Sequence, residues 1–404
     1  MATNAQDASR LFDGSRLTLA RNLAGLRKNQ LADLVDKSAT AVTGWEQGSK
    51  RPTATNVAAL SLALGVEPGF FITGSPDLRQ GDALPHFRSL RSTSQLQRDQ
   101  AGAYGTLAME VAWGLERHAE FPDVDVPSFP VPDDEDSAEP EEAAHAVRKA
   151  WRLGDGPIRH MIRELENHGV LVVFSPPKTA SLDAFSIQGI QRPMVVLNPT
   201  KNDYYRQRFD VAHELGHLVM HADADPGSRL VEAQANRFAA ELLAPADSIR
   251  DSLPTTINAA AWGTFMTLKE EWCMSIQALL MRARVLDRLN EVSYRNAMMT
   301  LSSRGWRRTE PGQMTVLEQP SMLPRAVELL LGSGMDESLL AGQGHVPVEL
   351  FGIITSRTPG KLQDGDPDPD ENKRLVVSLF PTKASADDAA AVGTEPIQLT
   401  QERR

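Results

Sequence analysis

The chain has 404 residues, of which 41% are hydrophobic and 24% are charged, a balance typical of folded globular proteins. At roughly 100 to 200 residues per domain, this length predicts two to four folded units. The single cysteine, Cys273, excludes an internal disulfide framework and any zinc site built on cysteines. A metal site in this chain would have to use histidine and carboxylate ligands.

Membrane insertion and secretion are both disfavoured by the sequence. No apolar run reaches the roughly 18 residues that a membrane-spanning helix needs. The first 20 residues carry charges where a signal peptide would place its apolar region. We therefore expect a cytoplasmic protein with no membrane partner.

The net charge of −11 is distributed unevenly along the chain. Residues 121–145 contain nine acidic residues and no lysine or arginine, so this stretch alone contributes −9. Residues 14–75 contain seven basic and four acidic residues, which gives a local charge of +3. Because electrostatic attraction acts locally, the N-terminal end keeps the charge needed to approach a phosphate backbone.

Residues 17–72 show apolar residues at helical spacing in short pieces separated by glycine and proline. This pattern predicts an all-α bundle within residues 1–75. The sequence LADLVDKSATAVTGWEQG, residues 31–48, resembles the Cro/C1-type (XRE) helix-turn-helix domain. A first helix is expected to start near Lys28, and a second, over residues 39–47, to turn Val42 and Trp45 inward. The resemblance implies binding to a double-stranded DNA operator, and a two-fold symmetric operator requires a homodimer.

The second helix of this motif would enter the major groove, where its short outward side chains favour modest direct reading of bases. Ser38 suits the N-cap of this helix and Gly48 its C-cap. Basic side chains on either side are expected to contact phosphates. A bundle used only for dimerisation is the alternative, which the spacing and the local charge disfavour. The predicted DNA-binding residues are Lys28, Ser38, Ala39, Thr40, Thr43, Lys50 and Arg51.

The rest of the chain predicts an α+β fold that is mainly α. A helical connector (76–120) is followed by an acidic, proline-rich linker (121–143) with little to bury. A small domain over residues 144–255 follows, and then a helical C-terminal region (256–350). The last residues, 351–404, are expected to be mostly irregular, apart from a strand-like run at 374–380.

Within residues 144–255, we expect a short antiparallel sheet covered by helices. β-branched runs bounded by turn residues predict its strands. Apolar residues at helical spacing predict the helices. The predicted strands are 169–174, 184–187 and 193–198, and the predicted helices are 144–167, 203–221 and 229–243.

The sequence His213-Glu214-Leu215-Gly216-His217 lies within the predicted helix 203–221. On a helix, histidines four residues apart share a face and can converge on one Zn²⁺. Glu214 lies beside them, within reach of a water that the metal activates, as a general base must. Ordinary solvated histidines are the alternative, but three of the nine histidines fall within nine residues. The pattern therefore favours a zinc-dependent hydrolase.

A catalytic zinc has three protein ligands and one open position. Glu232 is our candidate for the third ligand, because it starts the helix 229–243, which a short loop would fold against the first. His221 is the competitor, since it extends the four-residue spacing from His217. A histidine at such a position more commonly supports a ligand or packs between helices.

Residues 208–221, RFDVAHELGHLVMH, and 232–245, EAQANRFAAELLAP, resemble the ImmA/IrrE zinc metallopeptidases. The resemblance implies a gluzincin-like domain in which Glu232 joins His213 and His217 as a zinc ligand and Glu214 is catalytic. It implies an endopeptidase of narrow specificity that cuts a helix-turn-helix repressor and so releases genes controlled by stress, phage defence or mobile elements. Three further residues in these motifs are expected to support the ligands from outside: His221, Asn236 and Arg208.

Two hypotheses for function follow. In the first, a DNA-binding regulator is fused to a zinc endopeptidase, latent until activated, that cuts another repressor or its own chain. Residues 194–198 would then pair with an extended substrate as an added strand. In the second, the protein is a non-proteolytic repressor or antitoxin-like binding protein, and its metal site senses or braces the fold. The intact Glu214 favours the enzyme, because a purely structural site needs no base.

Overall fold

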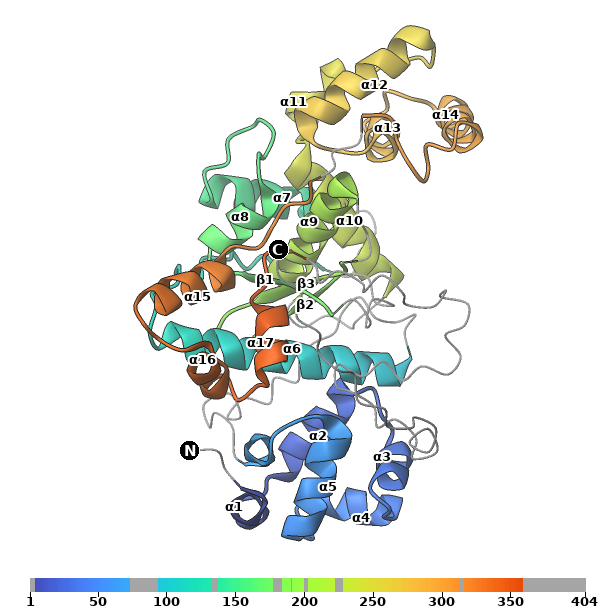
Figure 1. Cartoon of the computed structure of the whole chain (residues 1–404). Coiled ribbons are helices and arrows are strands. Elements are labelled where there is room, and N and C mark those ends of the chain that lie inside the picture. Colours follow the sequence, from blue (N-terminus) through green and yellow to red (C-terminus); the bar gives the residue numbers. More distant parts are fainter. Residues whose placement is uncertain are drawn as a thin grey trace, which may run out of the picture.

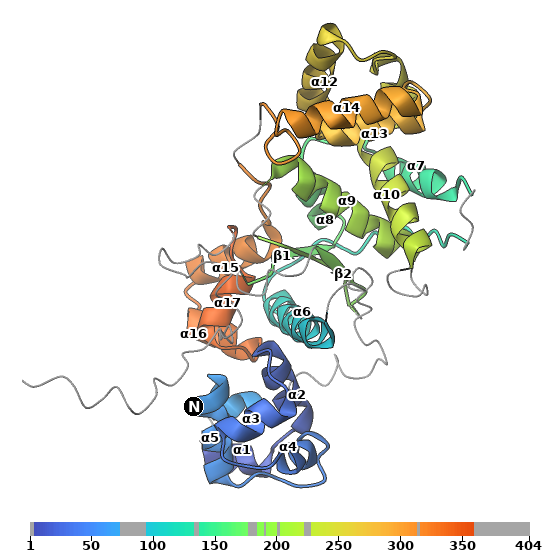
Figure 2. The ribbon, with the colours of Figure 1, turned by 90° about the vertical axis from the view of Figure 1, so that its right-hand side faces the viewer.

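The computed structural model describes residues 4–72, 94–132, 137–176, 184–189, 191–199, 203–221, 228–312 and 316–358. Helices dominate, and one small sheet lies near the middle of the molecule (Figures 1 and 2). The predicted fold class, α+β and mainly α, is confirmed. Within these ranges, none of the helices combines the length and the apolar character that a membrane span requires.

The N-terminal residues form the predicted all-α bundle. Several of its helices begin where a short polar side chain, such as that of Asp13 or Ser38, accepts a backbone N–H of the first turn. Val42 and Trp45 are buried as expected. The bundle consists of α1 (Ala5–Arg10), α2 (Gly14–Leu23), α3 (Lys28–Leu34), α4 (Ala39–Glu46), α5 (Ala54–Leu64) and the short 3-10 helix η1 (Pro68–Phe71).

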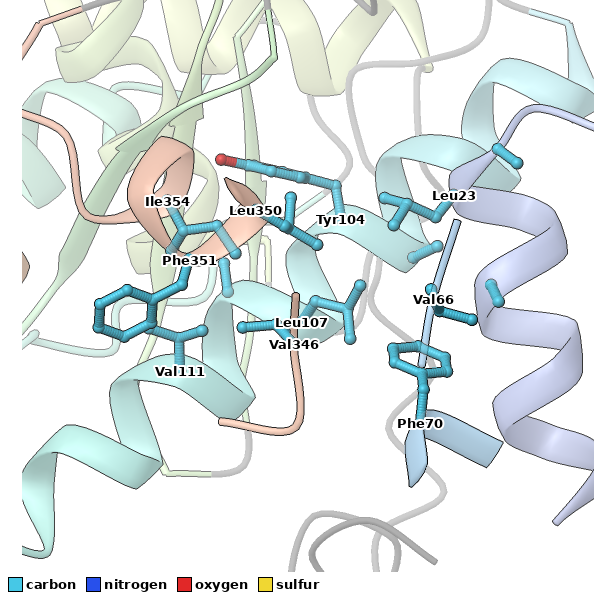
Figure 3. Close-up of a cluster of buried hydrophobic side chains, with 14 of the residues drawn as sticks. Leu23, Val66, Phe70, Tyr104, Leu107, Val111, Val346, Leu350, Phe351 and Ile354 are labelled. Atoms are coloured by element: carbon cyan, nitrogen blue, oxygen red, sulfur yellow. The ribbon is translucent and has the colours of Figure 1, made fainter. Parts of the chain in front are cut away.

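A helix of 22 residues, α6 (Gln95–Glu116), lies in the stretch predicted as a helical connector. Its Leu107 and Val111 join a buried apolar cluster that also contains Leu23 and Phe70 of the N-terminal bundle (Figure 3). α6 is therefore part of the hydrophobic core, and it attaches the N-terminal bundle to the rest of the described chain.

The opposite side of α6 packs on the sheet. A Cβ added at Gly105 would lie 2.2 Å from Cδ1 of Ile187, so a larger residue would require the Ile187 side chain or the helix to shift. The hydroxyl of Tyr104, which is buried, donates to the carbonyl oxygen of Phe174 at 2.7 Å. These contacts place α6 between the N-terminal bundle and the sheet (Figure 2).

The sheet has three strands in the order β1-β3-β2: β1 (Leu171–Phe174), β3 (Met194–Leu197) and β2 (Phe185–Ile187). β2 pairs antiparallel with β3, whereas β3 runs parallel to β1. The prediction of an antiparallel sheet was therefore wrong for one of the two pairings. Apolar patterning locates strands but does not specify which strands become neighbours, and here β3 lies between the other two.

Every residue of the three strands is buried. Because successive side chains of a strand point to opposite faces, both faces of the sheet must be covered. Alternate residues contact α6 on one face and the helices α8 and α9 on the other. The side chains on the α6 face are Leu171, Val173, Phe185, Ile187, Met194 and Val196, and those on the other face include Val172, Phe174, Val195 and Leu197.

The acidic segment predicted as a linker is irregular over residues 121–132, but it packs along the following domain. Phe129 is partly buried against the core, and its N–H donates to the carbonyl oxygen of Val219 at 2.9 Å. Helix α7 (Glu139–Ala150) begins within the predicted linker. The expectation that this segment has little to bury was wrong, because its scattered apolar residues find partners on helices that lie far away in sequence.

Two helices, α7 and α8 (Met161–Asn167), replace the single helix predicted over 144–167. The chain turns between them at Arg152 and Gly154, which have positive φ values of 55° and 66°. Left-handed backbone of this kind ends a helix. A run of helical periodicity therefore concealed a turn.

The helical C-terminal region divides into two parts. The first continues the core of the small domain, and the second packs against α6 (Figure 1). The first part contains the short helices α11 (Ala246–Ile249) and η4 (Arg250–Ser252) and then α12 (Ala259–Trp272), α13 (Ile276–Val285) and α14 (Glu291–Ser303). The second contains α15 (Met322–Gly332), α16 (Glu337–Gln343) and α17 (Val348–Ile354).

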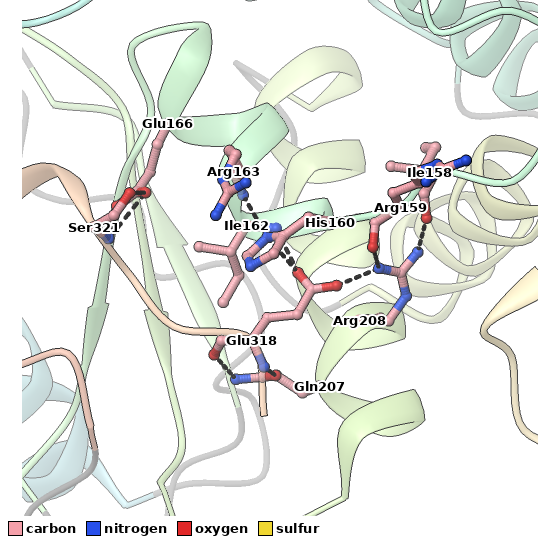
Figure 4. A network of polar contacts seen from close by, with 10 residues as sticks. All are labelled: Ile158, Arg159, His160, Ile162, Arg163, Glu166, Gln207, Arg208, Glu318 and Ser321. Atoms are coloured by element: carbon pink, nitrogen blue, oxygen red, sulfur yellow. Dashed lines mark hydrogen bonds and ion pairs between the residues drawn. The ribbon is translucent and has the colours of Figure 1, made fainter. Parts of the chain in front are cut away.

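A buried polar network attaches the segment between these two parts to α8 and α9 (Figure 4). Glu318, in the segment between α14 and α15, binds the guanidinium of Arg208 and accepts the backbone N–H of Ile162 at 2.8 Å. Glu166 accepts hydrogen bonds from the backbone and hydroxyl of Ser321. The helix α17 reaches Ile354, inside the predicted irregular tail, and the strand-like run predicted at 374–380 lies outside the described residues.

Candidate metal centre and DNA-binding surface

Helix α9 (Tyr204–Met220) presents the two histidines of the sequence motif on one face. The Nε2 atoms of His213 and His217 lie 3.0 Å apart. The side chain of His217 is fully buried, and that of His213 is 13% exposed. One site with limited solvent access therefore collects both imidazoles, as the spacing predicted.

Helix α10 (Arg229–Leu243) packs closely against α9 and brings a carboxylate to the two histidines. A Cβ added at Gly216 would lie 2.9 Å from Cδ1 of Phe238, so this glycine allows the close approach of the two helices. Glu232 places one oxygen 3.3 Å from Nε2 of His213 and the other 3.6 Å from Nε2 of His217. The ligand atoms of the three residues lie within 4.8 Å of one another.

The two separations between Glu232 and the imidazoles fit a tetrahedral metal ion, and the 3.0 Å between the two Nε2 atoms is slightly shorter than a zinc-bound pair requires. Ligand atoms about 2.0–2.2 Å from a tetrahedral zinc lie roughly 3.3–3.6 Å from each other. Oε1 of Glu232 is buried and makes no hydrogen bond within the described residues. A buried carboxylate oxygen without a donor needs a compensating partner, and a divalent cation would be one. The chemistry of this donor set therefore fits zinc.

Glu214 is 2% exposed and lies beside the histidine pair. Burial raises the pKa of its carboxyl to about 7, although the charge of His213 and the hydroxyl of Ser186 act in the opposite direction. Its Oε2 makes no hydrogen bond within the described residues. A carboxyl with a pKa near neutrality can both accept and return a proton, as a general base and acid must.

The residues expected to support the ligands have different positions. Asn236 contacts Nδ1 of His213 through its Oδ1 at 3.1 Å, and Nδ1 of His221 lies 3.0 Å from Nδ1 of His217. Arg208 makes neither contact: its guanidinium binds Glu318 and the carbonyl oxygen of Ile158. The expectation for Arg208 was wrong, because its side chain leaves α9 toward α8 and the segment before α15.

His221 was the competitor for the third ligand position. Its Nδ1 faces His217, and its Nε2 lies 3.0 Å from Oε1 of Gln234. Both ring nitrogens are thus engaged away from the Nε2 atoms of the ligand pair. Sequence reasoning missed Gln234, although it lies two residues after Glu232 in the same motif. It also missed Ser186, which comes from a strand far away in sequence.

Ser38, Ala39, Thr40 and Thr43 lie at or on α4, which Figure 1 shows at the end of the bundle away from α6, whereas Lys28 begins α3. Ala39 and Thr40 are exposed, Thr43 is half-buried, and Ser38 caps the helix by accepting the N–H of Ala41 at 3.2 Å. Ser38 therefore has a structural task at this end of the helix. The exposed residues form the outward face that the sequence predicted.

The three basic residues differ in how they are held. Lys50 and Arg51 are exposed, and together with Arg10, which sequence reasoning missed, they line a concavity of about 420 Å³. The ammonium of Lys28 lies 3.0 Å from Oε2 of Glu46, whose other oxygen binds Arg21. Lys28 is therefore partly neutralised by its own domain, and Lys50 and Arg51 are better placed to meet a phosphate.

Comparison with family models gives two matches, in different parts of the chain. Residues 165–284 match a peptidase family described as the IrrE N-terminal-like domain, and residues 17–71 match a helix-turn-helix family. The chain therefore carries an ImmA/IrrE-type peptidase domain behind a helix-turn-helix domain. The peptidase match contains His213, His217 and Glu232 and extends to residue 284 in α13, beyond residue 255, where the sequence predicted the end of that domain. Comparison with curated proteins gives no match.

The metal site gives a direct prediction. The purified protein should hold about one Zn²⁺ per chain, and substitution of His213 or His217 by alanine should abolish it, because three protein ligands are the usual minimum. Glu232→Ala should weaken binding strongly, and more than His221→Ala does, because His221 faces away from the ligand atoms. Metal analysis and competition with a chelator measure this order. Full occupancy after Glu232→Ala but not after His221→Ala would assign the third ligand to His221.

Proposed function

We propose that this protein is a transcription regulator whose own peptidase domain relieves repression. The helix-turn-helix domain binds a DNA operator, and a zinc-dependent endopeptidase site at His213, His217 and Glu232 cleaves a helix-turn-helix repressor, either another protein or a copy of this chain. The observation that carries the proposal is the buried Glu214 beside a three-residue metal-binding cluster. A metal site that only braces the fold has no use for such a carboxyl.

The chemistry divides between the metal and the protein. Zn²⁺ supplies Lewis-acid activation of a water molecule and of the scissile carbonyl. Glu214 accepts the proton of the attacking water and returns it to the leaving amine. Burial raises the pKa of this carboxyl to about 7, so both transfers are feasible near neutral pH. His213, His217 and Glu232 hold the metal, and Asn236 orients His213.

The sequence suggested that an extended substrate pairs with residues 194–198 as an added strand, and the sheet contradicts this. Those residues belong to β3, which is paired on both sides and has no free edge. The strand next to it, β2, carries Ser186, which is close enough to Glu214 to affect the pKa of that carboxyl.

The mass of the intact protein tests the proposal. The full chain, alone and mixed with a candidate helix-turn-helix repressor, should yield new termini when zinc is present. A chelator should suppress them, and added zinc should restore them. If neither protein acquires a new terminus under inducing conditions, the peptidase proposal fails.

DNA binding by the full chain should weaken steeply with salt. Each phosphate contact contributes about −0.9 to the slope of log affinity against log salt concentration. Lys50→Ala and Arg51→Ala should each reduce the slope by roughly 0.9, whereas Lys28→Ala should change it less because Glu46 already holds Lys28. Titrations of a duplex from the protein's own promoter region measure these slopes. The control is Lys149→Ala, which removes the same charge at an exposed position on α7. If Lys149→Ala reduced the slope as much as Lys50→Ala and Arg51→Ala, it would contradict the assignment of phosphate contacts to Lys50 and Arg51.

A further inference from the structure

A chain of four hydrogen-bonding groups runs outward from one of the metal-binding histidines. Nδ1 of His217 lies 3.0 Å from Nδ1 of His221, and Nε2 of His221 lies 3.0 Å from Oε1 of Gln234. Nε2 of Gln234 donates to the carbonyl oxygen of Pro132 at 2.8 Å. His217, His221 and Gln234 are each at most 2% exposed. The chain therefore lies in a region where an unpaired donor or acceptor is costly.

The last group fixes the direction of the whole chain. A carbonyl oxygen can only accept, so the amide nitrogen of Gln234 must face Pro132 and its oxygen must face His221. That oxygen accepts from Nε2–H of His221, which leaves Nδ1 of a neutral His221 as an acceptor. Nδ1 of His217 must then carry the proton and donate. The remaining nitrogen of His217, Nε2, is the atom that lies among the metal-binding groups.

The opposite direction is unfavourable in this structure. With His221 neutral, a proton on Nε2 of His217 would require His221 to donate from Nδ1 and to accept at Nε2. Gln234 would have to turn its amide nitrogen toward His221 and its oxygen toward Pro132. Two carbonyl oxygens would then face each other at a partly buried position, and such an arrangement loses a hydrogen bond and adds repulsion.

We propose that Gln234 is a positioning residue for the metal site and acts through His221 on His217. Together, the Pro132 carbonyl, Gln234 and His221 hold the proton of His217 on Nδ1, so that Nε2 presents its lone pair to the metal. The proposal rests on the metal site of the proposed function and assigns a task to a residue that is not a ligand. It also makes the segment 121–132, which precedes the peptidase helices, part of the support of the metal site.

The segment is fixed close to the point where the chain of hydrogen bonds ends. The N–H of Phe129 donates to the carbonyl oxygen of Val219 on α9 at 2.9 Å, three residues before Pro132. The neighbouring residues Val126 and Val131 pack partly buried against the core. The carbonyl of Pro132 is thus held in place by contacts that do not involve Gln234, and it can act as a fixed acceptor.

Zinc affinity of the full chain tests this proposal. Gln234→Met removes both hydrogen bonds at nearly constant size and should weaken zinc binding about 10- to 100-fold, the usual effect of losing a group that orients a ligand. The matched control is Gln207→Met. Gln207 is also a buried amide that makes two hydrogen bonds, with the N–H of Glu318 at 2.9 Å and its carbonyl oxygen at 3.1 Å, away from the metal site. Gln207→Met should leave zinc affinity unchanged, and circular dichroism of the zinc-free variants confirms that both fold.

Two further measurements separate a relay from a general loss of packing. Once His221 is replaced by Phe, the additional change Gln234→Met should weaken zinc binding by much less than it does in the wild type, because Gln234 acts through His221. Nitrogen NMR of the zinc-free protein should show His217 with its proton on Nδ1, and Gln234→Met should give a mixture of the two tautomers.

The outcomes distinguish this proposal from the proposed function. Unchanged zinc affinity in Gln234→Met, or an equal loss in Gln207→Met, overturns the role of Gln234 and leaves the peptidase proposal standing. Purely additive effects of the two substitutions overturn the route through His221. If the wild-type protein binds no zinc, the proposed metal site fails, and the NMR measurement still decides whether Gln234 fixes the tautomer of His217.

Discussion

Replacing Glu214 by glutamine is expected to lower the rate of peptide cleavage on the order of 10²- to 10⁴-fold, the usual cost of losing a general acid and base. Glutamine has nearly the same shape as glutamate, but its amide cannot accept the proton of water. Glutamine fits the buried space that Glu214 occupies, so the fold should be unchanged. The zinc content should also be unchanged, because Glu214 is not one of the three ligand residues. DNA binding should also be retained, since α9, which carries Glu214, and the helix-turn-helix bundle lie on opposite sides of α6 (Figure 1).

The comparison is made on fragments detected by intact mass and on reporter expression from the controlled promoter under DNA damage and phage infection. Glu271→Gln, which makes the same chemical change at an exposed position on α12, is the control. If cleavage relieves repression, Glu214→Gln should give permanent repression, and Glu271→Gln should behave as the wild type. Normal induction and an unchanged fragment pattern in Glu214→Gln would reject the peptidase and favour a repressor braced by its metal.

Features that depend on local sequence were predictable. The spacing of His213 and His217 on a helix, the N-cap at Ser38 and the inward positions of Val42 and Trp45 all follow from residues a few positions apart. Such signals arise from helical periodicity and from the needs of helix ends. They are sufficient to locate the helix-turn-helix and the candidate metal site along the chain.

Features that depend on distant pairs were not predictable. Gln234 meets the carbonyl of Pro132, Arg208 meets Glu318, and β3 lies between β1 and β2. A polar pair separated by about a hundred positions leaves no periodic trace in the sequence. The expectation for Arg208 failed for this reason, because the motif placed it near the ligands in sequence but its partner comes from the segment before α15.

The junction between the DNA-binding bundle and α6 was not predictable from the sequence either. Arg16 of α2 donates from Nη1 to both carboxylate oxygens of Glu110 on α6, at 2.7 and 2.8 Å. Its Nε and Nη2 donate to the carbonyl oxygens of Phe70 and His345, each at 3.0 Å. Arg16 is 2% exposed and Glu110 is 6% exposed. One buried guanidinium thus joins the bundle, α6 and the turn between α16 and α17.

Glu110→Ala is therefore expected to destabilise this junction by about 3–5 kcal/mol, because removing one partner leaves the other charge buried and unpaired. Thermal unfolding of the full chain should begin at a lower temperature, and limited proteolysis should release the N-terminal bundle more readily. The double variant Arg16→Met/Glu110→Met should recover much of the loss, since a well-packed apolar pair can replace a buried ion pair at little cost. If Glu110→Ala and the wild type unfolded at the same temperature, the ion pair would contribute nothing to the stability of the junction. If the bundle is released while zinc binding and peptidase unfolding stay unchanged, the pair holds the DNA-binding bundle in place without supporting the catalytic core.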